Sequence, residues 1–188
     1  MKYIFLFSLL LVAFSSQSQE ELPYYEIPEA PERFTAGTVA ARAVDGLGFR
    51  YYWATEGLRE EDLAFKPNEG ARTNLETIEH IYGLSKMIVN STLKKDNNIK
   101  ADEEELSFDA MRKATLINFK TAADILRTSE DISQYKIIFG EREIPFWNQI
   151  NGPIEDAVWH CGQVVLLRRS SGNPFNSKVS VFSGKLRD

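Results

Sequence analysis

The sequence predicts an all-α fold of four helices, with a small hairpin-like insertion before the fourth. Three stretches repeat apolar residues at the spacing of one helix face. A fourth begins at a proline and ends at a cluster of Ser, Gly, Asn and Pro. Between the third and fourth stretches, a short β-type segment interrupts the helical pattern. With 188 residues, the chain fits one domain that can bury a substantial core.

The N-terminal residues have the pattern of a secretory signal segment. Lys2 precedes an apolar run at residues 3–14, and Ser16 and Ser18 give the small-x-small spacing that signal peptidase recognises. The run is shorter than the ~20 residues that span a bilayer as a helix. We therefore expect residues 1–18 to be removed and the protein to be exported, either periplasmic or secreted. An uncleaved membrane anchor is the alternative.

The composition limits the partners that the mature protein can bind. We place an extended arm, rich in Glu, Pro and Tyr, at residues 19–33 and the domain at residues 34–188. The net charge is −5, and loss of the single positive charge of Lys2 with the signal segment changes it to −6. Phosphate backbones repel such a protein, so we expect no nucleic-acid partner. The single Cys161 cannot form an internal disulfide.

The first predicted helix carries apolar residues at alternating spacings of four and three, namely Ala40, Val44, Leu47, Tyr51 and Ala54. Gly46 and Gly48 each weaken this helix by about 1 kcal/mol relative to Ala. Glycine also permits close approach of a neighbouring segment. We expect a polar loop, with Pro67 and Gly70, to follow this helix.

The second predicted helix opens with a capping box. In such a box, the Thr73 hydroxyl and the Glu76 carboxylate satisfy free backbone donors reciprocally. The apolar face of this helix continues to Ile88 and includes His80, before a charged, Asn-rich link at residues 94–105. The third predicted helix again shows one apolar stripe, made of Phe108, Met111, Thr115, Phe119, Ala122 and Leu126.

The segment before the fourth helix is strand-like. In residues 135–147, Gly140 can turn the chain and Pro145 confines the second strand to an edge. The fourth helix is predicted to begin at residues 151–153 and to end at residues 170–174. We expect the apolar tail that follows to pack back on the domain. Packing is also the expected role of Trp53, Trp147 and Trp159.

The fourth helix carries the residues that point to chemistry. Asp156 and His160 are four residues apart, so both side chains project from one face, and Gln163 lies one turn further along. A carboxylate and an imidazole at this spacing can bind one cation. The alternative is a core histidine, with Asp156 at the positive end of the helix dipole. His80 also occupies an inward-facing helical position, but spacing does not show that the two helices are neighbours. Cys161 is expected to be a small buried hydrophobe.

The order of these elements resembles the DinB-like metal-binding four-helix bundles. So do the motifs Leu-Glu-Thr-Ile-Glu-His80 and Trp-His160-Cys-Gly-Gln163, and the resemblance covers roughly residues 34–169. In that family, a His on the second helix joins a His-x-x-x-His pair on the fourth. By position, His80 and His160 correspond to two of these ligands. Asp156 stands where the family has the first His of the pair.

The resemblance implies an up-down-down-up bundle with a divalent metal bound by His80, Asp156 and His160. Two His and one carboxylate leave coordination positions open for water or a ligand. Zinc is the first expectation because three protein ligands and one water complete its tetrahedral shell, and Ni, Fe and Mn are the alternatives. We expect Gln163 to orient a bound water or ligand; an ordinary hydrogen bond between helices is its alternative role.

Two classes of function follow from this resemblance. The first is a metal-dependent hydrolase or thiol-dependent transferase that acts on a small molecule. The second is a non-enzymatic metal-binding or stress-associated module, in which the metal is structural or sensory. A bundle without metal is the third reading. The sequence also leaves open a homodimer formed through helix faces.

Overall fold

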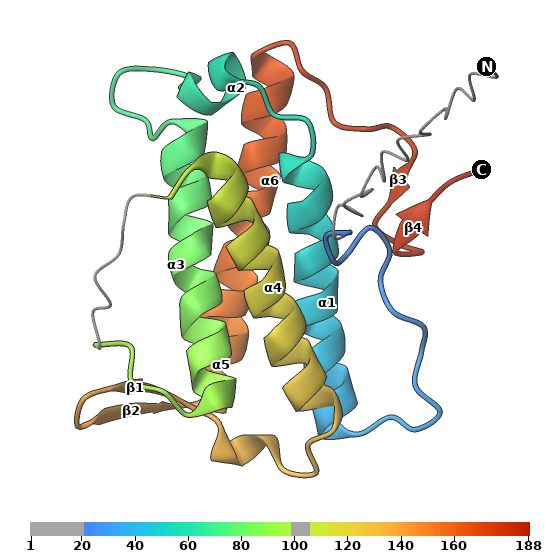
Figure 1. The fold of residues 1–188 in the computed structure, drawn as a ribbon, viewed down its shortest axis with the longest axis vertical. Helices are drawn as coiled ribbons and strands as arrows, with labels where there is room; N and C mark the ends of the chain where they lie inside the picture. The colour runs from blue at the N-terminus through green and yellow to red at the C-terminus, as the bar shows by residue number, and fades with distance from the viewer. Residues whose placement is uncertain (1–20, 99–105) are drawn as a thin grey trace, which may run out of the picture.

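The computed structural model describes residues 21–98 and 106–188, which form a mostly helical protein with short hairpins (Figure 1). Its helices are α1 (Ala36–Thr55), α2 (Glu60–Ala64), α3 (Asn74–Leu93), α4 (Phe108–Arg127), α5 (Phe146–Gln149) and α6 (Glu155–Ser170). A 3₁₀ turn (Ile132–Gln134) follows α4 and a π-helical turn (Ile150–Ile154) precedes α6. The strands are β1 (Lys136–Phe139), β2 (Arg142–Pro145), β3 (Val179–Ser180) and β4 (Lys185–Leu186).

Two predictions lie outside the described residues. One is the signal segment at residues 1–18, together with its cleavage site. The other is residues 99–105, which form the second part of the charged link predicted at residues 94–105. Within the described ranges, no helix combines the length and the apolar character needed to cross a membrane.

The four long helices pack around one core. α1 and α3 each contact both α4 and α6, so α1 lies diagonally opposite α3. In Figure 1, α1 and α6 run in one direction while α3 and α4 run in the other. The prediction of a mainly α-helical protein is therefore confirmed. The order of helix directions is up-down-down-up.

The N-terminal arm packs across α1. Tyr24 is buried, and its hydroxyl donates a hydrogen bond to Asp45 at 3.3 Å. A Cβ added at Gly48 would lie 2.4 Å from the Tyr24 ring, so only glycine leaves room for this contact. The close approach that the sequence indicated at Gly48 is made by the arm. The arm also reaches the tail, because the Ile27 amide donates to the Gly184 carbonyl at 2.8 Å.

The predicted capping box fixes the start of α3. The Glu76 amide donates to the Thr73 hydroxyl at 3.1 Å, and the Thr73 amide donates to the Glu76 carboxylate at 2.6 Å. These two bonds satisfy backbone donors that have no partner within the helix. The helix that carries His80 therefore begins where the sequence predicts.

The hairpin before the fourth helix is also present. β1 and β2 pair antiparallel, with Lys136 opposite Pro145, and Gly140 turns the chain with a φ of +61°. α6 itself begins at Glu155, later than predicted. Gly152 has a non-helical ψ of −112°, and Pro153 lacks the amide hydrogen that a continuous helix requires at that position. The chain therefore enters α6 through a π-helical turn.

The expectation of a polar loop after α1 missed the short helix α2. Asp62 on α2 is buried and accepts hydrogen bonds from Arg59, Ser171 and Asn173. Arg168 on α6 donates to backbone carbonyl oxygens at the end of α1, among them that of Ala54 at 3.0 Å. This polar cluster holds the ends of α1, α2 and α6 together.

Several aromatic residues do not pack as predicted. Trp53 is buried and contacts Val179 of the tail, but the Trp147 and Trp159 side chains are 78% and 72% exposed. Phe182 is 99% exposed, at the turn between β3 and β4. Apolar character alone predicted burial at these positions. These side chains project outward from the hairpins and helices that carry them, and no other described element covers them.

Candidate metal centre

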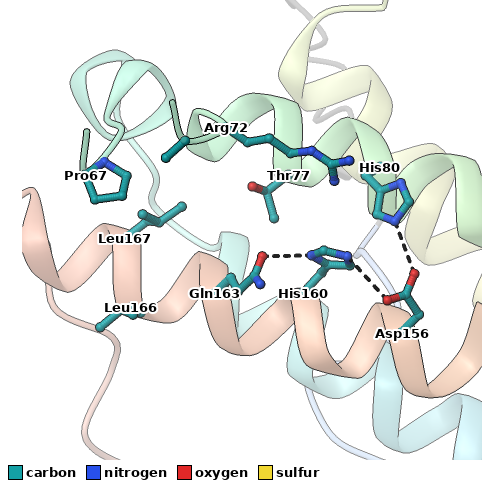
Figure 2. Close-up of a pocket in the computed structure, with 10 residues that line it drawn as sticks. Pro67, Arg72, Thr77, His80, Asp156, His160, Gln163, Leu166 and Leu167 are labelled. Atoms are coloured by element: carbon teal, nitrogen blue, oxygen red, sulfur yellow. Dashed lines mark hydrogen bonds and ion pairs between the residues drawn. The ribbon is translucent and has the colours of Figure 1, made fainter. Parts of the chain in front are cut away.

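The two histidines and Asp156 lie together between α3 and α6 (Figure 2). His80 Nε2 is 3.2 Å from Asp156 Oδ2, and His160 Nε2 is 3.4 Å from Asp156 Oδ1. The imidazole rings are 4.6 Å apart between centroids and nearly perpendicular, at 83°. One potential ligand atom from each of the three residues lies within 4.8 Å of the others. The structure thus brings together the three residues that the sequence indicated.

Packing of apolar residues on both helices sets this arrangement. On α3, the buried Ile78 and Ile81 flank His80 along the chain and anchor that part of the helix in the core. On α6, Ala157 and Cys161 are buried in the same cluster. The site therefore lies at the edge of the core. The His160 side chain is 14% exposed, whereas those of His80 and Asp156 are 36% and 42% exposed.

Gln163 contacts one ring nitrogen of His160. Its Oε1 lies 2.8 Å from His160 Nδ1, and because an amide oxygen accepts, this contact is a hydrogen bond when Nδ1 carries the hydrogen. In neutral His160, the lone pair then resides on Nε2, the nitrogen that faces Asp156. Orientation of a ligating His through its other nitrogen is typical of metal sites.

The contact between His160 and Asp156 is favourable when a proton or a cation lies between the two atoms. A carboxylate oxygen and the lone pair of Nε2 repel each other at 3.4 Å unless a proton or a cation lies between them. Ligand atoms around a tetrahedral ion with bonds of 2.0–2.2 Å are about 3.3–3.6 Å apart. Each imidazole nitrogen lies near this distance from one Asp156 oxygen, at 3.2 and 3.4 Å, but the two oxygens differ, and one potential ligand atom from each residue lies within 4.8 Å of the others. The three side chains could therefore hold a divalent cation.

A cleft of about 620 Å³ opens onto the three side chains. Thr77, Arg72 and Gln163 line it with polar groups, and Pro67, Ala71, Leu166 and Leu167 contribute apolar surface. This volume falls in the range of small-molecule sites. In Figure 2, Arg72 extends along the wall of the cleft toward His80.

Sequence reasoning missed most of this lining. Thr77 precedes His80 by three residues, and Leu167 follows Gln163 by four, so helical spacing would have placed both on the site face. Arg72 lies directly before the Thr73 cap, where the chain is not yet helical. Periodicity carries no information at that position, and only the fold brings Arg72 to the cleft.

Cys161 and the tyrosines do not belong to the centre. Cys161 is 2% exposed and packs in the core, as predicted. Burial raises the pKa of its thiol to about 12, so the thiolate is scarce near neutral pH. Tyr51, Tyr52 and Tyr82 do not line the cleft.

Fold and site together define a mostly helical protein with a His–His–Asp group that could hold a divalent metal ion. In comparisons with protein-family models, curated proteins and solved structures, nothing matched the chain. The resemblance to DinB-like bundles therefore enters below as a proposal.

Proposed function

We propose that this protein is a DinB-like, metal-dependent enzyme that acts on a small molecule. In this proposal, His80, Asp156 and His160 hold one divalent ion, with zinc the first expectation and Ni, Fe or Mn the alternatives. The observation that carries the proposal is the His160 imidazole, which donates to Gln163 and presents its other nitrogen to Asp156 at the edge of an open cleft. The up-down-down-up helix directions, which the family resemblance implies, support it further.

Each residue of the centre has a role that its contacts support. Gln163 holds His160 in the tautomer with a free Nε2, and Asp156 balances positive charge between the two imidazoles. When bound, a divalent ion supplies a Lewis acid that polarises a carbonyl group and activates water or a thiol. Buried Cys161 offers no reactive thiolate. The attacking group is therefore a water, for a hydrolase, or the thiol of a co-substrate, for a thiol-dependent transferase.

A non-enzymatic metal-binding or stress-associated module is the competing proposal. A structural zinc site normally has four protein ligands, whereas a catalytic site keeps a position open. Within residues 21–98 and 106–188, the potential ligand group at this centre comprises three side chains. Its position on the cleft favours the enzyme.

Metal analysis of protein purified without a His tag tests the metal centre. We expect close to stoichiometric metal in the wild type and strong loss in His80→Ala and Asp156→Ala. Glu155→Ala is the matched control, because it removes an exposed carboxylate one residue away on the same helix. Equal metal in the wild type and in His80→Ala would overturn the site.

A turnover panel tests the enzymatic part separately. Metal-loaded protein is expected to cleave a member of an ester and amide panel, or to transfer a thiol to an electrophile. Activity should disappear in Asp156→Ala and persist in Glu155→Ala. If metal binds and no substrate class turns over, the non-enzymatic module replaces the enzyme.

We also propose that the protein is exported after cleavage following Ser18. The apolar run at residues 3–14 and the small residues after it support this. Mass spectrometry of the protein from the extracytoplasmic fraction should find an N-terminus at Gln19. Recovery of intact Met1 from the cytoplasm would contradict export.

A further inference from the structure

Arg72 is the feature of the cleft that the proposed metal chemistry does not use. Its guanidinium extends along the cleft wall toward His80 (Figure 2). Among the residues that the structure describes, no hydrogen bond or ion pair engages it. Other arginines are occupied: Arg59 pairs with Asp62, Arg112 with Glu56, Arg127 with Asp45, and Arg168 binds backbone carbonyl oxygens.

The backbone at Arg72 is fixed relative to the metal-ligating group. Arg72 directly precedes Thr73, whose capping box with Glu76 starts α3, and His80 lies on the same helix two turns later. The acidic residue closest in sequence, Glu69, pairs with Lys66 at 3.2 Å, and the next closest is Glu76. Its carboxylate accepts the Thr73 amide at 2.6 Å and does not line the cleft. The charge of Arg72 therefore remains available to a molecule in the cleft.

With a divalent ion bound, the positive charge of the cleft favours the binding of anionic ligands. A divalent ion contributes +2, Arg72 +1 and Asp156 −1, so these groups sum to +2 in a protein of net charge −5. A guanidinium presents paired donors that match the two oxygens of a carboxylate. Leu166 and Leu167 supply apolar surface for the body of such a ligand.

We propose that the cleft binds a small organic carboxylate, with its anionic end on Arg72 and its reacting group at the His80–Asp156–His160 centre. This inference rests on the proposed function and names its substrate class. The cleft of about 620 Å³ is large enough for a ligand that spans both ends. Arg72 is then a specificity residue, because it recognises the carboxylate at a distance from the reacting atoms.

Hydroxamic acids of increasing chain length are suitable probes, because the hydroxamate group binds metal ions. Each chain ends either in a carboxylate or in a methyl group, and binding to zinc-loaded protein is measured by calorimetry. At the best chain length, we expect the carboxylate probe to bind at least about tenfold more tightly, as hydrogen bonds to charged groups permit. Arg72→Gln should abolish this preference, and Arg72→Lys should retain part of it.

Arg142→Gln is the matched control, since it removes the same charge from an exposed position on β2 outside the cleft. It should keep the full preference for the carboxylate probe. A preference that is absent at every chain length, or that survives in Arg72→Gln, would overturn the role of Arg72.

The two proposals fail in different ways. If methyl-terminated probes bind the wild type and not Asp156→Ala, the metal centre stands whatever the result at Arg72. If the protein holds no metal, the proposed function falls and the inference on Arg72 falls with it. Circular dichroism of Arg72→Gln should match the wild type, because this exposed side chain makes no hydrogen bond or ion pair with the described residues.

Discussion

At the scale of residues, His160 contacts Gln163 through one ring nitrogen and Asp156 through the other. In a neutral histidine that donates through one nitrogen, the other nitrogen can only accept. Here the second nitrogen meets a carboxylate oxygen at 3.4 Å. The polarity of that contact leaves a place for a proton or a cation between the two atoms.

Replacement of Gln163 should weaken metal binding. We expect Gln163→Leu to reduce zinc affinity about 10- to 100-fold, because the hydrogen bond that orients a metal-ligating His is lost. Competition with a chromogenic chelator measures the affinity. Gln163→Glu keeps an acceptor at the same position and should bind zinc within a few-fold of the wild type. Equal affinity in Gln163→Leu and the wild type would assign Gln163 to packing alone.

At the scale of elements, the contact between the arm and α1 depends on a single glycine. Gly48 faces the Tyr24 ring, whereas a Cβ at Gly46 would meet only the flexible end of Arg50, at 3.2 Å. The two glycines are two residues apart on one helix, so they form a matched pair for mutation.

Alanine at position 48 should destabilise the protein, whereas alanine at position 46 should not. Gly48→Ala forces Tyr24 out of its buried position, and we expect a loss of about 1–3 kcal/mol in the free energy of unfolding. Gly46→Ala removes the entropic cost of glycine in a helix and should change stability by between zero and about +1 kcal/mol. Urea denaturation measures both. Equal destabilisation would show that α1, rather than the arm, is sensitive at this point.

The polar cluster around Asp62 should make stability depend on pH. Hydrogen bonds, chiefly from Arg59, hold the pKa of the Asp62 carboxyl well below its usual range. A depressed folded-state pKa gives stability that is present above the unfolded pKa, about 3.9, and lost as pH falls toward the folded value. Asp62→Asn should therefore cost about 2–4 kcal/mol at neutral pH and progressively less below pH ~4. Denaturant unfolding across this range measures it; a constant difference at every pH would contradict the ionised state.

At the scale of the whole molecule, the proposed metal joins α3 to α6, which contact each other but do not follow one another in sequence. A ligand that binds only the folded state stabilises it by about 2.7 kcal/mol at a hundredfold excess over its dissociation constant. Metal occupancy should therefore be visible in the unfolding of the whole chain.

Addition of zinc should raise the melting temperature of the wild type and leave that of His80→Ala unchanged. For a chain of this size, the gain corresponds to about 5–11 °C, because each kcal/mol shifts the midpoint by about 2–4 °C. Differential scanning fluorimetry with and without a chelator measures the shift. An equal shift in both proteins would place metal binding elsewhere.

Much of the fold could be predicted because helix signals are local. The capping box at Thr73, the apolar stripe of α4 and the stop after Ser170 each depend on residues within a few turns. The delayed start of α6 was missed because the backbone at Gly152 departs from helical geometry. The exposure of Trp159 was not predicted, because the burial of an apolar side chain depends on which other elements pack over it. The amino-acid composition does not carry that information.

By itself, the sequence determined the pairing of Asp156 with His160, since one turn of a helix fixes their separation, and it singled out His80 as an inward-facing histidine. The tertiary structure alone decided that His80 meets this pair and that Arg72 lines the same cleft. The physical reason is distance along the chain. Helical spacing fixes contacts within a helix, whereas contacts between α3 and α6 depend on how the whole core packs.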